Sequence, residues 1–161
     1  MRVHGEIFGD WDKFAQTLNA LQDNTEAYKT VVRQMGAEIV ERIWDLIESQ
    51  SIDLEPLVEE YRRQKVFEGY DERILIRTGN FLNSINVTDI KVSGYDIEVK
   101  IGVDGGTTET GLSMHELASF LEYGTSKMQG REPFRKSWDA MKEDVKGEIM
   151  SQLKGIILED L

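Results

Sequence analysis

Two long stretches of the chain repeat apolar residues every three or four positions, the spacing that places them on one face of an α-helix. The first stretch predicts a helix over residues 26–48, and the second predicts a long helix that begins at Pro133. Proline is favoured at the first position of a helix, because an N–H there would have no partner within the helix. The apolar positions are Ala27, Val31, Met35, Ile39, Ile43, Leu46 and Ile47 in the first stretch and Phe134, Trp138, Met141, Val145, Ile149, Leu153 and Ile156 in the second.

A period of two marks the middle of the chain and predicts a β-hairpin. Apolar and polar residues alternate over residues 96–103, which predicts a strand with one apolar face, and residues 87–92 are its expected partner across a turn at residues 93–95. In that partner strand Ile85 and Val87 share one parity, whereas Ile90 and Val92 share the other. Such a switch is what a β-bulge produces, so we expect one within this strand.

Shorter elements flank these features. Residues 2–8 predict a strand, and residues 11–21 predict a helix capped by Asp10. Ser113 and Glu116 form the capping-box pattern for a short helix, and Gly124 is well placed to end it. Residues 49–73 are less regular: we expect a helical turn or two around Leu54 to Tyr61, followed by a loop over residues 64–70. A connection of this length in a small domain is usually functional or mobile.

This order of elements predicts the α+β class. We expect an antiparallel β-sheet with a central hairpin, packed against N-terminal helices and a long C-terminal helix. The chain has 161 residues, so we expect one domain over residues 1–161.

Composition narrows the classes of function. The chain has 30 acidic and 19 basic residues, a net charge of −11, and this balance opposes nucleic-acid binding through the phosphates. It has no cysteine, which excludes disulfides, thiolate metal sites and cysteine nucleophiles. No stretch approaches the ~20 apolar residues of a membrane helix, and the first residues lack the apolar centre of a signal peptide. We therefore expect a protein that stays soluble where it is made.

The residue types that carry chemistry form no pattern of a known active site. The two histidines, His4 and His115, lie far apart in the sequence and do not make a zinc site. The loop from Asp104 to Gly106, with Glu109 after it, lacks the ligand spacing of a calcium loop. Among so many carboxylates, nothing marks one pair for acid–base catalysis. No metal, cofactor or enzymatic activity is expected.

In two segments, the combination of glycine, capping and charged residues is more specific than the packing of a core requires. In residues 75–85, Gly79 permits a tight turn and Thr78 can cap the turn that follows. In residues 116–134, a short helix ends at Gly124, a polar loop carries Lys127 and Arg131, and Pro133 opens the long helix. Isolated bases on a loop of an acidic chain can position that loop against the carboxylates of a neighbouring protein.

Together these segments resemble the neck and tail-completion proteins of tailed bacteriophages, a head–tail joining and tail-terminator-like family. Members typically combine an R-T-G-x-L-x-x-S-I element, a β-hairpin, a string of the form E-[FY]-G-T-S-K-M, and a Pro-Phe pair before a C-terminal helix. Here Glu132 is an extra residue between the matching arginine and proline. The matching residues are Arg77, Thr78, Gly79, Ser84, Ile85, Glu122, Tyr123, Gly124, Thr125, Ser126, Lys127, Met128, Arg131, Pro133 and Phe134.

The resemblance implies a structural virion protein and not an enzyme. It would form a ring of identical copies, a hexamer or a dodecamer, at the junction between the phage head and the tail tube. Its partners would be further copies, a head-closure or connector protein and the tail tube protein. Virion DNA would pass through the lumen without specific binding, which agrees with the acidic charge. The protein would be made in the host bacterial cytoplasm and located in the virion neck or tail, with no membrane partner and no cofactor.

On this interpretation the matching residues divide into two groups. One group would contact a neighbouring subunit or partner: Glu122, Tyr123, Thr125, Ser126, Lys127, Met128 and Arg131. The other would be structural: Arg77, Thr78, Gly79, Ser84, Gly124, Pro133 and Phe134. Three alternatives stay open. They are a minor tail or baseplate-proximal protein on the same fold, a small hydrolase that uses carboxylates, and an adaptor domain that binds a peptide at an exposed sheet edge.

Overall fold

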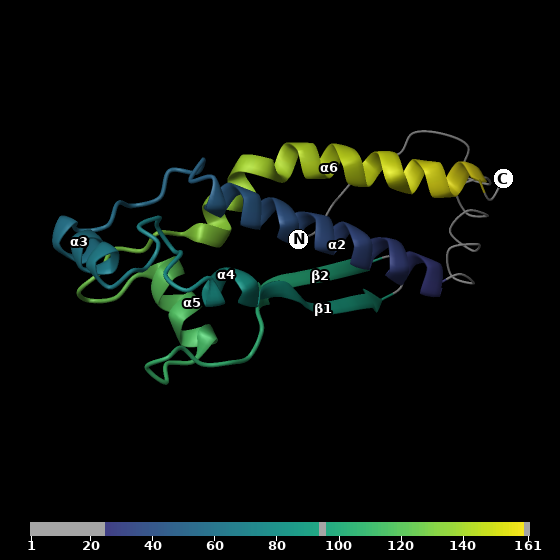
Figure 1. Ribbon diagram of the computed structural model, residues 1–161. Helices are drawn as coiled ribbons and strands as arrows, with labels where there is room; N and C mark the ends of the chain where they lie inside the picture. The colour runs from purple at the N-terminus through teal and green to yellow at the C-terminus, as the bar shows by residue number, and fades with distance from the viewer. Residues whose placement is uncertain (1–24, 94–95, 160–161) are drawn as a thin grey trace.

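The computed structural model describes residues 25–93 and 96–159 of the chain (Figure 1). The expected strand over residues 2–8 and the expected helix over residues 11–21 lie outside the described residues. Helices and strands follow in the order α2 (Thr25–Glu48), α3 (Glu59–Phe67), α4 (Asn80–Ser84), β1 (Ile85–Ser93), β2 (Asp96–Val103), α5 (Met114–Tyr123) and α6 (Pro133–Glu159). The α+β class predicted from the sequence is confirmed.

Helix α2 is the central element, because it lies between the β1–β2 hairpin on one side and α6 on the other (Figure 1). It therefore buries residues on two faces: Met35, Val40, Ile43 and Ile47 are buried, and Ile39 and Leu46 are partly buried beside them. Val32 of α2 is buried as well, and the remaining buried apolar residues come from other parts of the chain: Ile52, Leu54, Ile76, Phe81, Leu82, Ile85, Val103, Met114, Met141 and Val145.

The two strands pair antiparallel and contain the expected bulge. Val87 is the partner of Ile101, whereas Asp89 is the partner of Lys100, so Thr88 is the additional residue on β1. Beyond that point the apolar parity changes, and Ile90 pairs with Val99. The bulge keeps apolar side chains directed toward α2 on both sides of the irregularity. Within the described residues the sheet has two strands.

A glycine allows α2 to approach the hairpin closely. A Cβ atom added to Gly36 would lie 2.8 Å from Cγ2 of Val87 and 3.3 Å from Cγ1 of Val99. Both distances are shorter than the 3.5–4.0 Å of optimal carbon contacts. The absence of a side chain at Gly36 therefore sets the distance at which helix and sheet pack.

The connection between α2 and α4 contains more helix than the sequence suggests. Helix α3 extends to Phe67, so the expected loop over residues 64–70 is wrong for its first half. The segment is held by buried groups: Ile52 and Leu54 join the core, and Lys65 is buried although it is charged. The Nζ atom of Lys65 donates hydrogen bonds to the carbonyl oxygens of Arg73 and Ile76, at 2.9 and 2.8 Å. This lysine therefore anchors α3 to the chain that leads into α4.

Candidate contact surface on the segment between α5 and α6

Helix α5 begins and ends as its sequence predicts. The Ser113 hydroxyl accepts a hydrogen bond from the amide of Glu116 at 3.2 Å, and the Glu116 carboxylate accepts one from the Ser113 amide at 3.3 Å, which completes the capping box. At the other end Gly124 has φ 80°, a value that favours glycine, and its amide donates to the carbonyl of Phe120. These two ends determine where the chain leaves the helix.

The residues after α5 form a small closed loop. The amide of Thr125 donates to the carbonyl of Met128 at 2.8 Å, and the loop closes where Gly124 and Gly130 meet. A Cβ atom on Gly124 would lie 2.6 Å from the amide nitrogen of Gly130. A Cβ atom on Gly130 would lie 2.6 Å from the carbonyl oxygen of Glu122. Both glycines are therefore required, and Gly130 is a structural residue that the motif comparison missed.

Glu122 uses its side chain to cap the long helix. Its two carboxylate oxygens accept hydrogen bonds from the amides of Phe134 and Arg135, at 3.0 and 3.1 Å. These amides belong to the first turn of α6, where N–H groups have no partner within the helix and a negative charge is favourable. Pro133, which has no N–H, is fully buried at the first position. Glu122 was expected to contact a partner, but both of its oxygens bond within the chain.

Arg131 is also directed inward. Its relative exposure is 9%, and its Nε atom donates to the carbonyl oxygen of Glu55 at 3.2 Å. One of its terminal nitrogens lies 3.0 Å from Sδ of Met128. Arg131 is therefore buried within its own chain and not exposed on the loop, and its role in a contact with a neighbour stays a prediction. Arg131 ties the loop to the segment before α3, and Lys136 does the same from α6 by donating to the carbonyl of Asp53.

What remains on the outside of the loop is one aromatic and one basic group. Tyr123 is 84% exposed, and Thr125, Ser126 and Lys127 are exposed at the tip, whereas Met128 is partly buried. Among the described residues, the Lys127 ammonium forms no ion pair. Tyr123, Thr125, Ser126 and Lys127 are thus the expected contact residues that the fold leaves accessible to a neighbour.

The first motif forms a corner that supports the second. Gly79 has φ 80° at the start of α4, and the Thr78 hydroxyl accepts a long, 3.4 Å hydrogen bond from the Asn80 amide. Ser84 donates to the carbonyl of Phe81 at 2.7 Å and precedes the fully buried Ile85.

Phe81 and Arg77 connect this corner to its surroundings. The Phe81 ring packs edge-on against the ring of Phe134, with 6.4 Å between centroids, so the two motifs meet in space. The Arg77 guanidinium lies 4.3 Å above the ring of Tyr70 and 3.3 Å from a carboxylate oxygen of Glu68.

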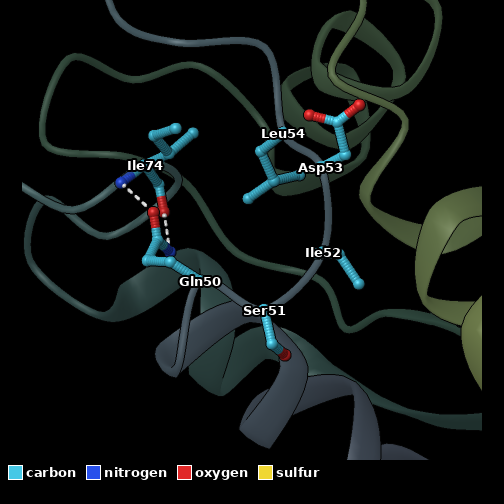
Figure 2. Close-up of a pocket in the computed structure, with 6 residues that line it drawn as sticks. All are labelled: Gln50, Ser51, Ile52, Asp53, Leu54 and Ile74. Carbon is cyan, nitrogen blue, oxygen red and sulfur yellow. Dashed lines mark hydrogen bonds between the residues drawn. The ribbon is translucent and has the colours of Figure 1, made fainter.

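A shallow pocket of about 380 Å³ lies between the end of α2 and Ile74 (Figure 2). The Gln50 side chain lines this pocket and bonds to both backbone groups of Ile74, accepting from the amide at 2.9 Å and donating to the carbonyl at 3.2 Å. Among the described residues that line the pocket, Asp53 is the one ionisable residue. Over residues 25–93 and 96–159, no group of three or more histidine, aspartate or glutamate side chains could hold a metal ion, and no helix is long and apolar enough to cross a membrane.

These observations describe an α+β protein in which a closed loop between α5 and α6 leaves Tyr123 and Lys127 exposed. Residues 12–124 match the family described as "Bacteriophage HK97-gp10, putative tail-component". The chain belongs to this HK97-gp10-like family, and it is a structural component of the phage tail within the virion. No curated protein and no solved structure matches it.

Proposed function

We propose that this chain is the subunit of a ring at the phage head–tail junction, where it completes the tail and joins it to the head. The ring would be a hexamer or a dodecamer, with a head-closure or connector protein on one side and the tail tube protein on the other. The support is the family membership together with the two matching motifs, which pack against each other through Phe81 and Phe134.

The observation that carries the proposal is the shape of the segment between α5 and α6. Two glycines, the Glu122 cap and the buried Arg131 hold the loop in one conformation. The same loop presents Tyr123 and Lys127 outward. A rigid loop with an exposed aromatic ring and a cation that forms no ion pair with the described residues loses little entropy when a partner covers it. Such a loop suits a permanent contact in an assembly.

The acidic charge fits a ring through which DNA moves. A chain with a net charge of −11 repels phosphates, so DNA would pass through the lumen without adhering to the wall. In each copy, the contacts to the neighbouring subunits must then come from local apolar and polar complementarity, because the copies carry the same net charge.

Electron microscopy of a phage that lacks this chain tests the proposal. A head–tail junction protein should leave DNA-filled heads and separate full-length tails, and expression of the chain from a plasmid should restore joined particles. Tails that never form would instead indicate a baseplate-proximal role in starting the tail. Normal joined virions without the chain would refute the proposal, as would its absence from purified wild-type virions.

A further inference from the structure

Helix α3 presents an apolar surface that the described part of the chain does not cover. Phe67 of α3 is 92% exposed, Val66 and Tyr61 of the same short helix are also exposed, and Val58, which immediately precedes the helix, is 72% exposed. This surface, here named the α3 surface, lies at the end of the molecule opposite the free end of the hairpin (Figure 1). It is held in place from beneath, because the buried Lys65 bonds to the backbone of Arg73 and Ile76.

Phe67 is the most exposed large apolar side chain among the described residues. An aromatic side chain offers roughly 150–250 Å² of area, and isolated monomers rarely expose contiguous apolar patches beyond a few hundred Å². A second aromatic site lies on α5, where Tyr123 and Phe120 are both exposed. Taken together, the two sites offer several hundred Å². That is the scale of the apolar centre of a standard interface, which buries about 1,600 Å² in total.

Two different apolar sites on one chain suit a head-to-tail contact. A two-fold contact needs one self-complementary surface, whereas a ring needs two unlike surfaces that fit each other. The α3 surface and the Tyr123 site are on different elements of the fold, so one copy can offer the first while it uses the second.

Each site has an exposed charged side chain without an ion pair among the described residues, and these two side chains are opposite in sign. On α3, Arg62 and Arg63 bond to Glu59 at 2.9 and 2.8 Å. Glu60 is exposed and has no ion pair among the described residues. Glu60 precedes Phe67 by seven positions, which places both on one face of the helix. Beside Tyr123, the exposed cation is Lys127.

We infer that the α3 surface binds the Tyr123 loop of a second copy of this chain, with Phe67 against Tyr123 and Glu60 paired with Lys127. This contact rests on the proposed ring and names the two surfaces that would close it. An aromatic centre provides the affinity, and the ion pair at its edge sets the orientation. The shared net charge does not prevent the approach, since charges are screened beyond about 8 Å at physiological salt.

Cysteine cross-linking in virions tests the pairing, because the chain has no cysteine of its own. A phage that lacks the gene is complemented with Phe67→Cys, with Tyr123→Cys, or with both variants expressed together, and the purified virions are then mildly oxidised. We expect covalent dimers only when both variants are present. A chain that carries both substitutions should give a ladder that ends at the number of subunits in the ring. Glu143→Cys, on the exposed side of α6, is the control and should give no dimer.

A charge exchange tests the orientation independently. Lys127→Glu alone and Glu60→Lys alone should each lower the titre of infectious particles by about tenfold or more, because each places like charges together. The double variant should restore the titre, since every contact again joins opposite charges. Lys146→Glu on α6 changes the charge equally and should have no effect, and thermal melting checks that each variant remains folded.

The outcomes separate this inference from the proposed function. Dimers from Phe67→Cys alone would show a two-fold contact and overturn the pairing. Virions that contain the chain but give neither cross-links nor charge rescue would overturn the pairing and leave the ring proposal standing. If the wild-type chain is missing from virions, the proposed function itself fails.

Discussion

Replacement of Gly36 by alanine should destabilise the protein, although alanine is the better helix former. Gly36 lies inside α2 where that helix crosses the hairpin, and a new Cβ atom would approach Cγ2 of Val87 to 2.8 Å. Gly147 lies inside α6 with no atom within 4 Å of the corresponding Cβ position. The same substitution therefore has opposite expected effects at two helical glycines.

The magnitudes follow from two terms. Alanine in place of glycine within a helix stabilises by about 1 kcal/mol at either position. At Gly36 the overpacking against Val87 and Val99 costs about 1–3 kcal/mol, because both partners are β-branched side chains that cannot turn away easily. Gly147→Ala should thus be more stable than the wild type by up to about 1 kcal/mol. Gly36→Ala should be less stable than Gly147→Ala by about 1–3 kcal/mol.

Urea unfolding followed by circular dichroism measures both free energies. A change of 1 kcal/mol corresponds to roughly 2–4 °C in Tm for a chain of this size. The double variant Gly36→Ala, Val87→Ala serves as a further test, because removal of the Val87 methyl groups should recover part of the overpacking cost. Equal stabilities of Gly36→Ala and Gly147→Ala would refute the reasoning, since they would mean that helix and sheet do not meet at Gly36 as closely as described.

Three further predictions concern the candidate surface and its supports. Glu122→Ala should lower the free energy of unfolding by about 1–2 kcal/mol, since it removes the charged cap of α6, and a change below about 0.5 kcal/mol in urea unfolding would contradict the cap. Lys127→Glu should leave Tm unchanged and impair virion assembly. Arg131→Glu should lower Tm, because it places a carboxylate against the carbonyl of Glu55. Similar Tm values for the two variants would argue against the burial of Arg131. The Arg73 side chain, by hydrogen bonding, lowers the pKa of Asp71 from 3.8 to about 2, so the pair's small stabilisation is present above pH 4 and lost as the pH falls toward 2. The wild type should therefore exceed Asp71→Asn in stability at pH 6 and match it near pH 2, and an unchanged difference at both pH values would exclude the shift.

The sequence predicted the features that depend on neighbours along the chain. The helix over residues 26–48, the capping box of Ser113 and the bulge in β1 all follow from periodicity or from fixed offsets of two to four positions. The same is true of Gly124, whose position after a short apolar helix indicated its end. The boundaries of α3 were wrong because its mostly polar sequence shows little periodicity, and the hydrogen bonds of the buried Lys65 to Arg73 and Ile76 are not visible in the local sequence.

The roles of the residues around the candidate surface were decided by contacts between distant positions. Nothing in the local sequence shows that Glu122 caps a helix that begins eleven residues later, or that Arg131 bonds to Glu55, which lies 76 positions earlier. Motif comparison grouped both with Lys127 as contact residues, because the three are similar in polarity and lie close together in the chain.

The sequence by itself thus determined the class of fold and most of its regular elements, though not the bounds of α3, because hydrogen bonding within helices and strands repeats at short, fixed spacings. Its motifs also indicated the family to which the chain belongs. Only the tertiary structure decided which polar side chains are used within the molecule and which remain for a neighbour. The reason is that burial and long-range hydrogen bonds depend on how elements pack. That packing turned Glu122 and Arg131 inward and left Tyr123, Lys127 and the α3 surface exposed.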